Sequence, residues 1–124
     1  MLNKILFVDD DRLIAELALF LMESNGFEVK HCSSGKEALK VAEKYNPDLI
    51  LLDMHMPEMN GEQTLSELKK IKSVKKIPVI FLTGSANEDD ENKYIEKGAI
   101  GVIAKPFNPK NYVKIFSIYG IKHE

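Results

Sequence analysis

The chain has 124 residues, enough for one packed domain and too few for two. Its hydrophobic fraction of 44% and charged fraction of 29% are those of an ordinary globular protein, and its net charge of -2 excludes the strongly basic surface typical of proteins that bind nucleic acid or anionic membranes. The single cysteine, Cys32, excludes an internal disulfide, and the sequence shows neither a signal peptide nor an apolar run of about 18 residues, so we expect a cytoplasmic protein.

Short apolar runs alternate along the chain with segments of helical period, the pattern of βαβ units on a parallel sheet. After the first run, a helix is predicted to begin near Asp11 and to end at Asn25-Gly26, since glycine adopts the left-handed conformation of a helix end at little cost. The residues from Phe27 to Cys32 alternate between apolar and polar, as in an edge strand. The apolar residues that we expect this first helix to bury are Leu13, Leu17, Phe20 and Leu21.

Capping patterns predict the next two helices. Ser34 and Glu37 have the spacing of a capping box. Asn60 and Gln63 repeat the pattern less strongly. The apolar residues expected on these helices are Ala38, Leu39 and Ala42 on the former, and Leu65, Leu68 and Ile71 on the latter.

The fourth helix has little apolar surface. Between residues 85 and 93 its only apolar side chain is Ala86, which leaves Tyr94 and Ile95 to attach it to the domain. We therefore expect weak packing, and weakly packed elements are the ones that move when a site changes state. A last helix is predicted from Asn108-Pro109 to Gly120.

Four of the apolar runs end beside a residue that phosphoryl chemistry can use. If the runs are parallel strands, their carboxyl ends meet at one edge of the sheet, where open α/β sheets bind ligands. Three carboxylates, a hydroxyl and an ammonium group suit a divalent cation such as Mg2+ together with a phosphoryl group. The runs and the residues that follow them are Lys4–Val8 with Asp9 and Asp10, Leu49–Leu52 with Asp53, Val79–Leu82 with Thr83, and Gly101–Ala104 with Lys105.

Each of these residues also has an ordinary structural interpretation. Asp9, Asp10 and Asp11 could together be a helix N-cap with a solvated turn, and for Asp11 alone the N-cap is the better interpretation. Asp53 alone could be another capping residue. In isolation, Lys105 would be a surface lysine and Thr83 a hydrogen-bonded hydroxyl at a strand end. Their joint position at the ends of separate strands favours a phosphoryl site.

The three histidines do not have the spacing of a zinc site. His31 falls in the predicted edge strand and His123 in the tail. Only His55 is expected near the crevice. No cysteine supports a zinc site either, so we expect none.

The segments that carry these residues resemble the receiver domain of two-component response regulators. They are Ile5–Asp11, Asp48–Pro57 with Gly61, Pro78–Gly84, and Gly98–Phe107. The resemblance implies a flavodoxin-like (βα)5 three-layer α/β sandwich, with a five-stranded parallel sheet of order 2-1-3-4-5. It also implies that residues 1–124 form one receiver domain, a stand-alone regulator of the chemotaxis or sporulation-phosphorelay type.

The resemblance assigns roles to the acidic residues. Asp53 would be the phosphoacceptor, whose carboxylate attacks a phosphohistidine and forms an acyl phosphate. Asp10 and Asp53 would ligate Mg2+ directly, Asp9 would act through a water molecule, and the backbone carbonyl of His55 would complete the protein ligands. Such a domain catalyses only its own phosphorylation and dephosphorylation and is not a turnover enzyme.

The resemblance also assigns Thr83 and Lys105 to the phosphoryl oxygens, and Gly84 would leave the site open. At one position the chain departs from the family. Receivers commonly place Tyr, Phe or His three residues before the lysine, where the ring swings inward on activation. Here that residue is Val102, whose β-branched side chain cannot make this movement.

The expected partners follow from the same resemblance. A sensor histidine kinase or His-phosphotransfer protein would supply the phosphoryl group, and a downstream protein would bind the face made by the fourth helix, the last strand and the last helix. Neither nucleic acid nor membrane is expected to bind directly, and the chain should be a monomer or weak dimer. The last helix offers more apolar surface than one buried stripe needs, from Tyr112, Ile115, Ile118 and Tyr119.

Three alternatives remain open at this point. A haloacid-dehalogenase-type phosphatase also uses Asp-x-Asp after a strand, but it needs an acidic pair after the lysine, where this chain has only Glu124. A binding-only pseudo-receiver would lack some of the site residues, and all five are present. A receiver piece of a hybrid kinase or DNA-binding regulator would have this same sequence, although the initial methionine and the lack of an output segment favour the stand-alone form.

Overall fold

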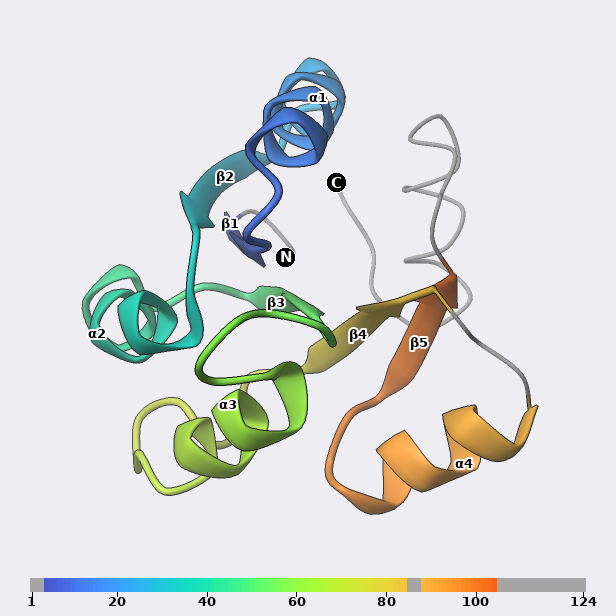
Figure 1. Ribbon diagram of the computed structural model, residues 1–124. Coiled ribbons are helices and arrows are strands. Elements are labelled where there is room, and N and C mark those ends of the chain that lie inside the picture. Colours follow the sequence, from blue (N-terminus) through green and yellow to red (C-terminus); the bar gives the residue numbers. More distant parts are fainter. Residues whose placement is uncertain (1–3, 85–87, 105–124) are drawn as a thin grey trace.

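The computed structural model of the chain describes residues 4–84 and 88–104, which form five parallel strands and four helices in strict alternation (Figure 1). The strands are β1 (Lys4–Val8), β2 (Glu28–Cys32), β3 (Leu49–Asp53), β4 (Val79–Thr83) and β5 (Gly101–Ala104). The helices are α1 (Arg12–Ser24), α2 (Gly35–Tyr45), α3 (Gly61–Leu68) and α4 (Glu88–Glu96). The predicted last helix, from Asn108-Pro109 to Gly120, lies outside the described residues.

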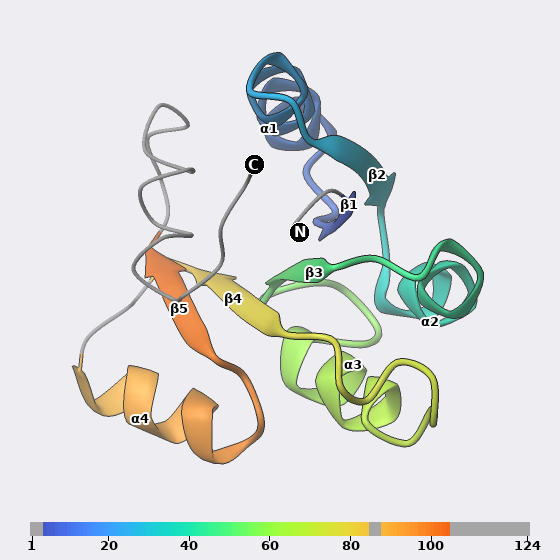
Figure 2. The same cartoon turned by 180° about the vertical axis from the view of Figure 1, so that it is seen from behind.

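The strands form one sheet of order β2-β1-β3-β4-β5, which confirms the predicted flavodoxin-like topology. Helix α1 covers one face of this sheet, and α2, α3 and α4 cover the other, as both views of the fold show (Figures 1 and 2). Each face therefore has its own core. Because all five strands are parallel, their carboxyl ends lie at a single edge of the sheet.

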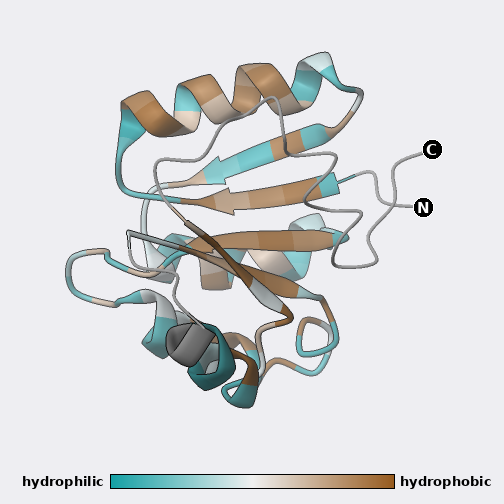
Figure 3. Cartoon of the chain, turned by 90° about the vertical axis from the view of Figure 1, so that its right-hand side faces the viewer, coloured by the Kyte–Doolittle hydropathy of each residue, from teal (hydrophilic) through white to brown (hydrophobic). Residues whose placement is uncertain are grey.

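The central strands are buried on both faces. Every residue of β3 and β4 is buried, whereas β2 at the edge alternates between exposed and partly buried side chains until it ends at the buried Cys32. The hydropathy of the strands follows this difference, since apolar residues fill the middle of the sheet and charged residues occur on β2 (Figure 3). Both β3 and β4 extend one residue further than predicted, so that Asp53 and Thr83 are the last residues of their strands.

The predicted buried face of α1 is wrong. Leu13, Leu17 and Phe20 are 79%, 56% and 67% exposed, and Leu21 is only partly buried. The residues that α1 buries against the sheet are instead Ala15, Ala18 and Met22. Two apolar stripes run along this helix, and the one with alanines packs inward because small side chains let the helix backbone approach the strands closely.

The two capping patterns are realised in the reverse of the predicted order of strength. Asn60 and Gln63 form the complete capping box, in which each side chain accepts a hydrogen bond from the other residue's backbone N–H at 2.9 Å. At α2, the Ser34 hydroxyl accepts from the Glu37 N–H, but the Glu37 carboxylate accepts from Ser33 instead of returning to Ser34. The carboxylate reaches one residue further back because Ser33 offers it both a backbone N–H and a hydroxyl.

Helix α4 is attached as weakly as its sequence predicts. Tyr94 is buried, but Ile95, which was expected to share this role, is 45% exposed.

The α3 helix ends before Ile71, which nevertheless packs against the core from the segment that follows. Among the described residues, no helix combines the length and the apolar character needed to cross a membrane.

The orientation of α1 can be tested with two substitutions, one expected to change the free energy of unfolding little and the other much more. Leu13→Ser should change the free energy of unfolding by about 0.5 kcal/mol or less, because the side chain is largely in water. Ala18→Leu should cost about 1–3 kcal/mol, because it overfills a close helix–sheet contact. Urea unfolding of both variants measures the difference, and a larger loss in Leu13→Ser than in Ala18→Leu would contradict this orientation.

Candidate functional site

Three of the predicted site residues occupy the ends of neighbouring strands. Asp9 directly follows β1, Asp53 is the last residue of β3, and Thr83 is the last residue of β4. Because β1, β3 and β4 are adjacent and parallel, these three residues lie along one edge of the sheet. The edge is the one where open α/β sheets bind their ligands.

The carboxylates of Asp9, Asp10 and Asp53 form a cluster. One oxygen from each lies within 4.8 Å of the others, although the residues come from two different strand ends. The side chains of Asp9 and Asp53 are buried, whereas Asp10 is exposed. The cluster is therefore a pocket of negative charge with one side open to solvent.

The loop between β1 and α1 is held by hydrogen bonds to its own carboxylates. The Asp9 N–H donates to the Cys32 carbonyl at 3.0 Å, which extends the β1–β2 pairing by one step. The Asp9 carboxylate accepts from the Asp11 N–H at 2.9 Å. Asp11 is the N-cap of α1, as predicted, and its side chain accepts from the N–H groups of Leu13 and Ile14.

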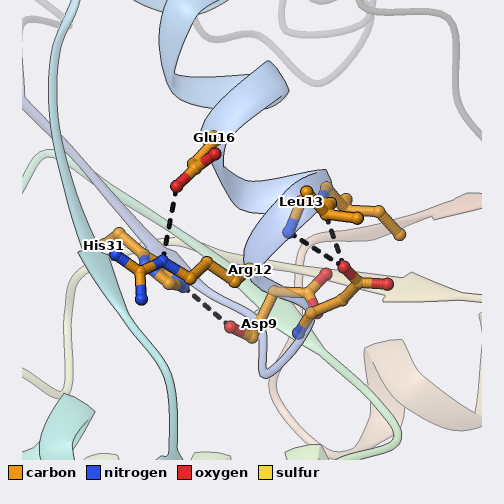
Figure 4. Close-up of polar contacts among 7 residues, drawn as sticks. Asp9, Arg12, Leu13, Glu16 and His31 are labelled. Atoms are coloured by element: carbon orange, nitrogen blue, oxygen red, sulfur yellow. Dashed lines mark hydrogen bonds and ion pairs between the residues drawn. The ribbon is translucent and has the colours of Figure 1, made fainter.

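His31 lies closer to this site than the sequence analysis placed it. Its Nε2 atom is 2.8 Å from the backbone carbonyl oxygen of Asp9 (Figure 4). The expectation that only His55 approaches the crevice is therefore wrong. The period of the edge strand could have located His31, since β2 pairs with β1 and residue 31 lies beside Phe7, two residues before Asp9. The ring supports the backbone of the loop that carries two of the three carboxylates.

Asp53 is positioned by the loop that follows it. Its Oδ1 atom accepts a hydrogen bond from the His55 N–H at 3.2 Å. The first residue of α3, Gly61, donates to the Met54 carbonyl at 3.0 Å, and a Cβ atom at residue 61 would stand only 2.6 Å from the Asp53 carbonyl oxygen. Glycine is therefore required at this position, because α3 begins directly against the backbone of the acidic residue.

The end of β4 contributes the Thr83 hydroxyl to the site, and Gly84 follows it. Thr83 is buried at the end of β4. A Cβ atom added at Gly84 would have no atom within 4 Å among those of the described residues, so this side of the site is open. Lys105 directly follows Ala104, the last residue of β5, and lies outside the described residues.

Cys32 is near the site but is not suited to react there. Burial, with a smaller contribution from the negative charge of Glu37, raises the pKa of its thiol from 9.0 to about 12. The thiol is therefore protonated at neutral pH, and a protonated thiol is neither a nucleophile nor a metal ligand.

The chemistry of the cluster fits a hard divalent cation. Its three donors are carboxylate oxygens, which such cations prefer over nitrogen or sulfur ligands. The open side at Asp10 leaves room for water molecules and for a phosphoryl oxygen. A magnesium ion, which keeps several waters and takes one or two carboxylates, fits this cluster if two of the carboxylates bind it directly and the third acts through a water molecule.

A family model described as the response regulator receiver domain matches residues 5–117. The chain is 33% identical over 119 residues to the polar-differentiation response regulator DivK of Brucella ovis, a match that covers 96% of this chain and 97% of DivK. It is 40% identical over 113 residues to a CpxR homolog of Haemophilus influenzae, which covers 90% of this chain and 48% of that protein. The chain thus spans about half the length of several of the curated relatives that it matches.

Solved structures give the same result. The chemotaxis response regulator CheY4 of Vibrio cholerae superimposes with a TM-score of 0.88 at 29% identity, over 96% of this chain and 99% of that one. The CheX-CheY-BeF3-Mg complex of Borrelia burgdorferi contains a chain that matches with a TM-score of 0.84 at 26% identity, over 94% of this chain and 89% of that one.

The crowding of the carboxylates predicts that removing one of them stabilises the metal-free protein. We expect Asp10→Asn to raise the melting temperature in EDTA by roughly a few degrees, because it relieves repulsion between like charges. Asp11→Asn is the matched control, since asparagine is an equally good N-cap and Asp11 is not a member of the cluster. A melting temperature that falls in Asp10→Asn, or rises as much in the control, would contradict the repulsion argument.

Proposed function

The chain belongs to the response regulator receiver domain family, and on that premise we propose that Asp53 accepts a phosphoryl group from a histidine kinase or His-phosphotransfer protein. In this step a carboxylate oxygen of Asp53 forms a bond to phosphorus while the bond from phosphorus to the donor's imidazole nitrogen breaks. The product is an acyl phosphate on Asp53 and a free histidine on the donor.

The observation that carries this proposal is the convergence of three carboxylates at the end of two strands. Asp53 is only 3% exposed, but its carboxylate lies in a cluster with that of Asp10. Asp10 itself is exposed to solvent. A buried carboxylate at the open edge of a sheet is reachable by a donor from one side only. The His55 N–H donates a hydrogen bond to Oδ1 of Asp53, which holds the Asp53 carboxylate against the loop that follows β3.

The proposal includes a magnesium ion as the cofactor. Asp10 and Asp53 would ligate it directly, Asp9 through water, and the His55 backbone carbonyl would complete the protein ligands. When bound, the ion neutralises negative charge on the carboxylates and on the incoming phosphoryl oxygens. The Borrelia neighbour, a complex with beryllofluoride and magnesium, supports this choice.

Two further residues would hold the transferred group. Thr83 donates its hydroxyl hydrogen to one phosphoryl oxygen, and the ammonium group of Lys105 pairs with another. With these residues the domain promotes its own phosphorylation and the later hydrolysis of its own acyl phosphate. It is proposed as a signalling phosphoacceptor, and the match to the receiver family argues against the phosphatase alternative.

The remaining parts of the proposal concern context. We take residues 1–124 to be a single receiver domain, as the similarity along almost all of DivK supports. We further propose that it acts in the cytoplasm as a monomer or weak dimer. The output surface would comprise α4, β5 and the predicted last helix, and its target would be a protein. The half-length match to transcriptional regulators keeps a larger regulator as the second candidate.

Phosphate uptake tests the acceptor. Wild-type protein incubated with acetyl phosphate and Mg2+ should gain the mass of one phosphoryl group, whereas Asp53→Asn should gain none because the nucleophilic oxygen is lost. Intact-mass measurement under identical conditions makes the comparison. Equal uptake by both proteins would remove Asp53 as the acceptor.

Metal binding tests the ligands. Mg2+ should raise the melting temperature of the wild type, because it binds only the folded cluster. Asp10→Ala should lose this stabilisation, and Asp11→Asn should keep it. If Asp10→Ala responds to Mg2+ as the wild type does, then Asp10 is not a ligand.

A further inference from the structure

Helix α4 is anchored to the core by one aromatic residue. Tyr94 is 8% exposed, and its ring meets that of Phe81 edge to face, with centroids 5.1 Å apart and an interplanar angle of 60°. The next residue, Ile95, points largely into solvent. The Tyr94 ring is therefore the main apolar contact that α4 makes among the described residues.

The strand beneath this ring leads directly to the phosphoryl site. Phe81 lies in β4 two residues before Thr83, so their side chains stand on the same face of the sheet. Phe81 also pairs in register with Val102 of β5. All three of Phe81, Tyr94 and Val102 belong to one core cluster. A ring contributed by α4 thus packs over the strand pair that contains Val102, the residue which stands where receivers commonly carry an aromatic side chain.

A second, weaker attachment joins α4 to α3. The Glu62 carboxylate accepts a hydrogen bond from Lys97 Nζ at 2.6 Å and lies 3.7 Å from Lys93 Nζ. The bond from Lys97 lowers the pKa of Glu62, so the contact is intact at neutral pH and is lost only as the pH falls into the acidic range. These side chains are partly in water, where ion pairs contribute little.

A groove runs along α3 and reaches Lys97, the residue that follows α4. It has a volume of about 460 Å3 and is lined by Glu62, Gln63, Ser66, Lys69 and Lys97, all of them polar. Because the residues that line this groove are polar, the apolar contact that holds α4 among the described residues is that of the Tyr94 ring with Phe81.

We propose that Tyr94 is the aromatic residue that couples phosphorylation to the output surface in this chain, in the place of a ring at residue 102. This inference rests on the proposed function of Asp53. When the hydroxyl of Thr83 closes on a phosphoryl group, the end of β4 and the start of the next loop shift. The Tyr94 ring must then move against Phe81, and α4 follows because its other attachment among the described residues consists of two partly solvent-exposed ion pairs, those of Glu62 with Lys93 and Lys97.

Hydrogen exchange and NMR on the full chain test this coupling, with beryllofluoride and Mg2+ as the activating ligand. In the wild type, the ring signals of Tyr94 should shift on activation, and the amides of residues 91–99 should change their exchange rate by about tenfold. Tyr94→Ala should exchange about tenfold faster in this segment before activation, since it loses the aromatic pair and its buried area. It should show little further change when the ligand is added.

Three variants serve as controls. Tyr94→Phe keeps the ring on Phe81 and should keep the response of α4. Ile95→Ala truncates the neighbouring exposed side chain and should also keep it. Glu62→Gln weakens the ionic contact and should speed exchange only slightly, again with the response retained.

The outcomes separate this inference from the function on which it rests. If Asp53 takes up no phosphoryl group in the intact-mass measurement, the proposed function fails. If uptake is normal but the Tyr94 ring signals do not shift, or Tyr94→Ala responds like the wild type, or Tyr94→Phe loses the response, then Tyr94 is not the coupling residue. Because Tyr94→Phe and the wild-type ring signals need no disruptive substitution, the test stands even if Tyr94→Ala unfolds.

Discussion

Three carboxylates held within 4.8 Å of one another are the constraint on which the rest of this structure depends. Two unit charges at such a distance repel by about 1 kcal/mol in water and by about 3–4 kcal/mol at the effective dielectric constant of about 20 that suits protein surfaces. The backbones of these residues cannot move apart to reduce the repulsion, because Asp53 is part of β3 and the Asp9 backbone is hydrogen-bonded to β2. A bound cation would therefore remove the repulsion between the carboxylates, and this gain in free energy would favour binding of the cation.

Small residues on both faces of the sheet make this arrangement possible. Ala15 and Ala18 let α1 lie close to the sheet, and Gly61 lets α3 begin against the Asp53 carbonyl. The acidic half of the site is thus fixed by tight packing and by hydrogen bonds. On the other half, a Cβ atom at Gly84 would meet no atom of the described residues within 4 Å. Among these residues, α4 is attached by the Tyr94 ring and by the ion pairs of Glu62 with Lys93 and Lys97. A rigid half that holds the charge and a loosely attached half that can move are what a switch requires.

The sequence predicted the convergence of the acidic residues because long apolar runs mark the strand ends clearly. The order of the strands in the sheet was predicted only from the resemblance to the receiver family. The sequence did not predict which stripe of α1 packs inward, since residues 13–22 are apolar apart from Glu16 and the choice depends on how closely the helix can approach the sheet. His31 was missed because its contact is to a backbone carbonyl, and the only signal for it is the pairing of β2 with β1, which places residue 31 beside Phe7. The role of Tyr94 depends on Phe81, a partner 13 positions away in sequence, so only the fold brings the pair together.

The most direct test of the central claim is a crystal structure of the protein with beryllofluoride and Mg2+, which stand in for the phosphoryl group and its cofactor. We expect beryllium to be bonded to a carboxylate oxygen of Asp53, and the metal ion to be held by Asp10 and Asp53. Thr83 should contact one fluorine. A fully occupied fluoroberyllate bound to any other residue, or a magnesium ion that does not touch the Asp9, Asp10 and Asp53 cluster, would contradict this account.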